Sequence, residues 1–188
     1  RRMEARVEVL DVRPVLCLPD FLRESKAALP GADETRELAS CCRQWPRLLN
    51  CLRVAFSAGE ETKIPGLLFI FLPESVERLV AEAWRRSPSH GYLLHNLAQK
   101  LCREALELIL PQVGVAGCAP VPRLGRAEED ALRQALGAHD KPASETAMAP
   151  SARLPGLGLA YSLLTYYPYL GQCACCALSE PCPKLRHS

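Results

Sequence analysis

The sequence predicts a mainly α-helical fold, arranged either as an irregular helical bundle or as a short HEAT-like layer of helices. Apolar residues recur at steps of three and four through the middle of the chain, the pattern of a helix with one buried face. Sixteen prolines divide the 188 residues into short elements and argue against one long coiled coil. No fixed sequence period is present, so the HEAT-like alternative depends on helix spacing alone.

Four segments are expected along the chain, from its turn and cap residues near position 32 and from changes in composition after residues 137 and 153. Residues 1–32 are predicted to form an extended segment followed by a short helix, and residues 33–137 a helical body. Residues 138–153 carry Pro, Ser, Thr and mixed charges without periodicity, which is typical of a flexible linker. Residues 154–188 form a tail that is rich in tyrosine and cysteine and carries no charged side chain from Leu154 to Ser179.

The first segment is expected to contain an edge strand. Residues 5–18 are rich in valine and alternate imperfectly between apolar and polar side chains. Pro14 confines such a strand to the edge of a sheet or ends it, because proline has no N–H to donate. Residues 20–29 fit a short helix that the following Pro-Gly pair would close.

The body is predicted to begin with two short helices. Asp33 can cap the first, and Pro46 fits the first turn of the second. The apolar side chains expected on the second helix are Leu48, Leu49, Leu52 and Phe56. Residues 67–72 are six consecutive apolar residues, and such a run fits either a buried strand or part of a buried helix.

The clearest helices form a pair. Pro73 opens the first, which has acidic residues in its first turn and two arginines at its end, as the helix dipole favours. The connection at residues 87–89 is short, which predicts an antiparallel hairpin. Residues 111–125 are expected to be a loop and residues 126–136 a last short helix. The predicted core side chains are Val76, Leu79, Val80, Trp84, Leu94, Leu97, Leu101, Leu106 and Ile109.

The irregular tail carries the sharpest chemical hypothesis, a zinc site. Cys173 and Cys176 form a C-x2-C pair, Cys182 follows after five residues and His187 after four more. Three thiolates and one imidazole can hold zinc tetrahedrally and would order a segment that has no core of its own. A second C-x2-C pair is missing, so the alternative is a tail whose thiols bind no cofactor.

Membrane contact is a second hypothesis for the tail. Residues 154–170 are apolar and contain four tyrosines, and cysteines beside such a segment can be S-acylated. A segment of about 17 residues is at the short limit for a span, and its prolines and glycines weaken a helix. Packing on the helical body, or disorder, is therefore the simpler interpretation.

Charge and motifs exclude several function classes. A net charge of +2 gives no general attraction for nucleic acid, and the basic residues of the central helices are interleaved with glutamates. No Walker or Gly-x-Ser-x-Gly sequence is present, so no catalytic residue is assigned. His95 is expected to be a polar residue at the helix surface or partly buried. The upstream cysteines are scattered, which favours a reducing intracellular location, cytoplasmic or nuclear.

These observations favour a non-enzymatic protein–protein interaction module that contacts other proteins through helical surfaces. Arg1 stands where an initiator methionine would be, so we expect a fragment or processed form of a larger scaffold or adaptor. The alternative is a targeting or metal-binding unit, whose tail binds zinc or associates with membrane through S-acylated cysteines.

Overall fold

The computed structural model describes residues 7–26, 34–57, 66–116, 118–124, 159–169 and 176. Most of these residues lie in helices, which confirms the mainly helical prediction, and a small antiparallel sheet accompanies them. In chain order the elements are β1 (Val7–Leu10), α1 (Leu18–Lys26), α2 (Glu34–Cys42), α3 (Trp45–Cys51), β2 (Arg53–Ser57), β3 (Gly66–Phe71), α4 (Glu74–Arg86), α5 (Pro88–Ile109), α6 (Pro111–Ala116) and β4 (Ser162–Tyr167). The expected helix at 126–136 and the expected linker at 138–153 lie outside the described residues.

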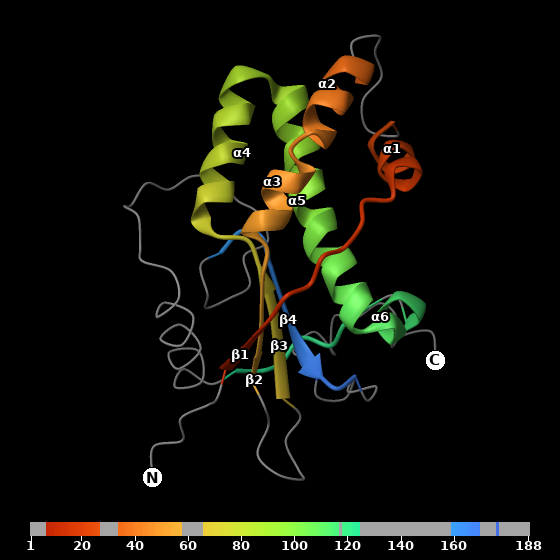
Figure 1. Cartoon of the computed structure of the whole chain (residues 1–188), viewed down its shortest axis with the longest axis vertical. Helices are drawn as coiled ribbons and strands as arrows, with labels where there is room; N and C mark the ends of the chain where they lie inside the picture. Colours follow the sequence, from red (N-terminus) through yellow and green to blue (C-terminus); the bar gives the residue numbers. More distant parts are fainter. Residues whose placement is uncertain are drawn as a thin grey trace.

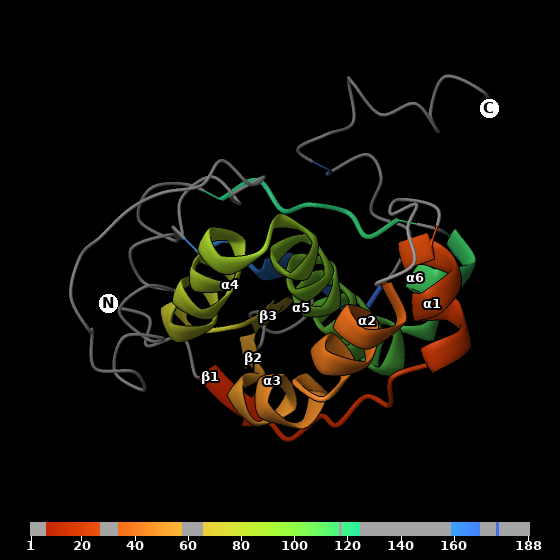
Figure 2. The same cartoon turned by 90° about the horizontal axis from the view of Figure 1, so that it is seen from above.

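Helix α5 is the centre of the fold (Figure 1). It contacts each of the other described helices as well as β3 and β4. Figure 2 shows α4 on one side of α5 and α2 on the other. The apolar stripe of α5 explains this position, because a stripe at three- and four-residue steps must be covered by other elements. Leu97, Leu101 and Ala105 from this stripe are completely buried.

The predicted α4–α5 hairpin is confirmed, and the two helices run antiparallel side by side (Figure 1). Ser87 caps α5, because its hydroxyl accepts a hydrogen bond from His90 N at 3.3 Å, and Pro88 occupies the first turn. Gly91 permits the close approach of the helices: a Cβ added there would lie 2.5 Å from Trp84 Cγ. The turn geometry therefore depends on a glycine at this position.

Most of the predicted core is confirmed, and Trp84 is the exception. Its side chain is 41% exposed, so the expectation that it belongs to the core is wrong. Trp84 packs closely against Gly91, and its indole and the ring of Tyr92 are in a T-shaped arrangement with centroids 6.5 Å apart. Leu79 and Ile109 are partly buried, and the fully buried members are Val76, Val80, Leu94, Leu97, Leu101 and Leu106.

The described sheet has four strands in the order β1-β2-β3-β4, with every neighbouring pair antiparallel. β1 lies at an edge, as predicted. The 67–72 run resolves as a strand, since residues 67–71 belong to β3, which pairs with β2 on one side and β4 on the other. A central strand that is buried on both faces has no alternation of apolar and polar residues, so its sequence pattern does not distinguish it from a buried helix.

Two sequence expectations for the sheet are wrong. The sequence predicts Phe56 on a helix, but α3 ends at Cys51 and Phe56 lies on β2 opposite Leu68. Pairing with β3 overrides local helix propensity here. The tail was expected to be irregular, but Ser162–Tyr167 form β4, so this part of the tail packs on the body.

The two faces of the sheet bury different clusters. Val54, Leu68 and Ile70 face the helices and join the main core. Phe69 and Phe71 alternate with them and lie on the opposite face, where their rings stack with centroids 4.8 Å apart. Leu164 of β4 packs with this second cluster. Strand β4 is thus held by apolar contacts at both faces.

Candidate functional site

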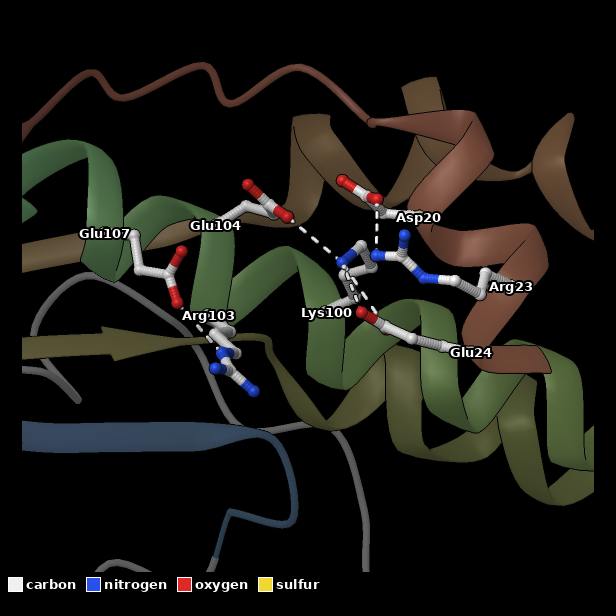
Figure 3. A network of polar contacts seen from close by, with 7 residues as sticks. All are labelled: Asp20, Arg23, Glu24, Lys100, Arg103, Glu104 and Glu107. Atoms are coloured by element: carbon white, nitrogen blue, oxygen red, sulfur yellow. Dashed lines mark hydrogen bonds and ion pairs between the residues drawn. The ribbon is translucent and has the colours of Figure 1, made fainter. Parts of the chain in front are cut away.

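Charged side chains follow the outer face of α5 (Figure 3). Lys100 Nζ lies 3.2 Å from Glu104 Oε1 and 3.4 Å from Glu24 Oε1 of α1. Arg103 Nε donates to Glu107 Oε1 at 2.9 Å, and Figure 3 shows this pair pointing away from Lys100. Each of these two cations has a carboxylate partner, so this face presents no uncompensated positive patch for phosphate.

Lys100 of α5 links the two helices through its ion pair with Glu24 of α1. Its side chain is only 11% exposed. Burial alone would lower the pKa of Lys100, but the hydrogen bond to Glu104 and the charges of Glu24 and Glu104 outweigh it, and the pKa is raised. The ammonium group therefore stays charged and has a structural role.

Three hollows adjoin this face of α5. The α1 hollow, about 290 Å³, lies between Phe21 of α1 and Gln99 of α5. The strip groove, about 360 Å³, lies between residues 13–15 and the last turns of α5. The β4 cavity, about 440 Å³, lies between α5, α6, β4 and residues 118–121. One helix thus connects three candidate binding surfaces.

The strip groove exposes large apolar side chains. The extended chain before α1 crosses α5, with Pro14 turned inward and buried and Val15 turned outward and 83% exposed. Leu108 of α5 lines the same groove and is 58% exposed. The charged residues that border the groove are Glu104, Glu107 and Arg13, and Arg13 Nε lies 3.3 Å from Asp11 Oδ1. The groove therefore combines apolar side chains with charged ones, two of which are acidic.

The entry to β4 is fastened to the helices by hydrogen bonds. Tyr161 Oη and His95 Nδ1 are 2.9 Å apart, and Ala160 N donates to Glu77 Oε1 at 2.6 Å. Leu72 N donates to Tyr161 O at 2.9 Å. Burial lowers the pKa of His95 and raises that of Tyr161, so both side chains are neutral near pH 7. The expectation of a surface or partly buried polar His95 is confirmed.

The buried thiols of the body are packing groups. Burial raises the pKa of Cys102 to about 12, and burial together with the smaller effect of neighbouring Cys42 raises the pKa of Cys41 to about 12. Cys102 Sγ lies 3.9 Å from Tyr161 O, to which it can donate. Protonated and enclosed thiols of this kind are poor nucleophiles.

The predicted zinc ligands are only partly described. Cys173, Cys182 and His187 lie outside the described residues. Cys176 is half-buried, and its Sγ accepts a hydrogen bond from Val121 N at 3.3 Å, across 55 residues of sequence. Among the residues with described positions, no group of three or more His, Cys, Asp or Glu side chains could hold a metal ion. The tail site therefore stays a prediction.

Sequence reasoning did not find the strip groove. Val15 lies in an alternating segment, and nothing local indicates that this segment crosses α5. Leu108 belongs to a Leu-Ile-Leu run, in which the sequence does not show which side chain is exposed. The only usable signal was the alternation itself, which places Val15 and Pro14 on opposite sides of the extended chain.

Comparison with known proteins finds no matching family model, curated protein or solved structure. Within the described ranges, none of the helices is both long enough and apolar enough to cross a lipid bilayer.

Proposed function

We propose that this chain is a non-enzymatic protein–protein interaction module within a larger intracellular scaffold or adaptor. The observation that carries the proposal is the strip groove, where Val15 and Leu108 are largely exposed although each is a strongly apolar side chain. Burying such a side chain against a partner stabilises the complex by about 2 kcal/mol. Two neighbouring anchors at one groove give a partner a defined place to dock.

The chemistry of the groove fits an amphipathic partner helix with basic residues beside its apolar stripe. Glu104 and Glu107 each use Oε1 in their contacts with Lys100 and Arg103. In the part of the chain that the structure describes, Oε2 of neither carboxylate has a partner (Figure 3). A lysine or arginine of the partner could therefore approach these oxygens, while apolar residues at helical spacing cover Val15 and Leu108.

The test begins with a photo-crosslinking residue at position 15 of the whole chain, in cells. The whole chain is required because the sheet includes strands on both sides of residues 33–137. Position 115 provides the matched control, since Val115 is also a valine, is 93% exposed, and lies on α6 outside the lining of the groove. A protein captured from position 15 alone is then purified for binding measurements.

Binding of that purified partner decides the proposal. Val15→Glu and Leu108→Glu should each weaken the binding of that protein by at least about tenfold, because the new carboxylate would be buried without an ion pair or hydrogen bond. Val115→Glu should leave the affinity unchanged. Equal losses from Val15→Glu and Val115→Glu, or no loss from either groove variant, would contradict the proposed docking surface.

A second candidate function is zinc binding by the tail, and one observation favours it. The N–H of Val121 points at the sulfur of Cys176, and backbone donors to cysteine sulfur are characteristic of metal–thiolate sites. Purified protein should then contain about one zinc per chain, and Cys176→Ala should lose it. Metal-free wild-type protein, prepared without chelators, would rule the site out.

A further inference from the structure

The β4 cavity is a groove that opens to solvent at Gln99 and Arg103 and is walled elsewhere by buried side chains. Its volume is about 440 Å³, and Cys102, Leu106 and Val113 in its wall are buried. Sites for small molecules have volumes of roughly 300–1,000 Å³ and mostly apolar walls. The cavity matches such a site in volume and in lining.

The interior of the cavity offers hydrocarbon, because the polar side chains in its wall already have partners. Thr165 Oγ1 donates to Pro120 O at 2.8 Å, and Ser162 Oγ donates to Leu159 O at 3.1 Å. Tyr161 Oη is engaged by His95. A polar ligand group placed here would lose its hydrogen bonds to water without replacement. The interior therefore suits an apolar body.

Free donors are found at the solvent side of the cavity. Gln99 and Arg103 are the exposed residues among the described part of its lining, so they mark the mouth. Arg103 uses Nε for Glu107, which leaves both terminal nitrogens of the guanidinium without a partner among the described residues. The side-chain amide of Gln99 is likewise unpaired within that part of the chain. Arginine and amide donors together suit a carboxylate.

From this arrangement we propose that the β4 cavity binds a small carboxylate amphiphile, with its hydrocarbon body between α5 and β4 and its carboxylate at Gln99 and Arg103. This inference shares Glu107 with the strip groove, but the variants that test the two proposals lie at different positions, 103 for the cavity and 15 and 108 for the groove. Glu107 also lines the mouth. Glu107 neutralises the guanidinium charge, so Arg103 offers the ligand the N–H donors of its terminal nitrogens and no net positive charge.

Straight-chain carboxylates, added to the whole protein below their micelle concentrations, test the proposal. Calorimetric titration with hexanoate, octanoate and decanoate should show one saturable site, whose affinity rises about fourfold for each added methylene, because one buried CH₂ contributes about 0.8 kcal/mol. 1-Decanol should bind at least about tenfold more weakly than decanoate, since it lacks the charged group. Uptake without saturation, an affinity that does not depend on chain length, or equal binding of 1-decanol would overturn the proposal.

Two variants locate the site. Arg103→Gln should weaken decanoate binding by at least about tenfold, because a hydrogen bond to a charged group is lost. Arg85→Gln is the matched control, since Arg85 is an exposed arginine on α4 without a partner among the described residues and lies outside this lining. Equal affinity of Arg103→Gln and wild type would refute the assigned head-group site. Methyl resonances of Val113 and Leu106 should shift on titration, and unshifted signals would refute the assigned cavity.

Discussion

Replacing Gly91 by alanine should destabilise the fold, although alanine is the better helix former. The added Cβ would lie 2.5 Å from Trp84 Cγ and 2.6 Å from Trp84 Cα. The second atom belongs to the backbone, so a change of rotamer cannot relieve the clash and α4 must move away from α5. Overpacking of this kind costs about 1–3 kcal/mol, whereas the gain in helix propensity is about 1 kcal/mol. Because the clash includes a backbone atom, its cost belongs in the upper half of that range, and we expect a net loss of about 1–2 kcal/mol.

Urea unfolding monitored by far-UV circular dichroism measures this change. Gly114→Ala is the matched control: the nearest atoms to its added Cβ are those of Glu107, at 3.7 Å or more, so this variant should be as stable as wild type or slightly more stable. Gly91→Ala,Trp84→Ala should recover only part of the loss, because the contact with the backbone of residue 84 remains. If Gly91→Ala unfolds at the same urea concentration as wild type, or at a higher one, the close helix approach is refuted.

Two further predictions concern the attachment of β4. Burial lowers the pKa of His95, so the folded state favours the neutral imidazole. This contribution to stability is fully present above the unfolded pKa of about 6.5, and it is lost as the pH falls through the folded pKa. Wild type should therefore lose more stability than His95→Gln between about pH 7.5 and about pH 5.5 in urea titrations, and equal losses would contradict this. Thr165→Val should cost about 1–2 kcal/mol, because Pro120 O loses its buried donor at 2.8 Å. An unchanged thermal midpoint for Thr165→Val would show that this bond contributes nothing.

The helical hairpin could be predicted because the information for it is local. Two neighbouring helices can be predicted without any tertiary contact. The signals are the acidic residues after Pro73, the short connection and the long apolar stripe. The same reasoning failed for Trp84. Its helical spacing matches the core, but its side chain packs against Gly91 and remains 41% exposed.

The candidate sites could not be predicted from the sequence, because each is formed by residues that are far apart along the chain. The strip groove brings Val15 beside Leu108, and the β4 cavity brings Cys102 beside Tyr161. Each pair is separated by tens of residues, and no spacing rule connects them. Hydrophobic periodicity indicates which face of an element is buried, but it does not indicate which other element covers that face.

The sequence by itself determined that the chain would be mainly helical, that α4 and α5 would pair, that the strand before Pro14 would lie at an edge, and which side chains of α5 would be buried. Only the tertiary structure decided that the run after Gly66 is a central strand, that Phe56 lies in the sheet, and that β4 closes it from the far end of the chain. The physical reason is the range of the interactions. A helix satisfies its backbone hydrogen bonds within itself and shows its buried face in its own spacing, whereas a strand is defined by a partner that its own residues do not specify.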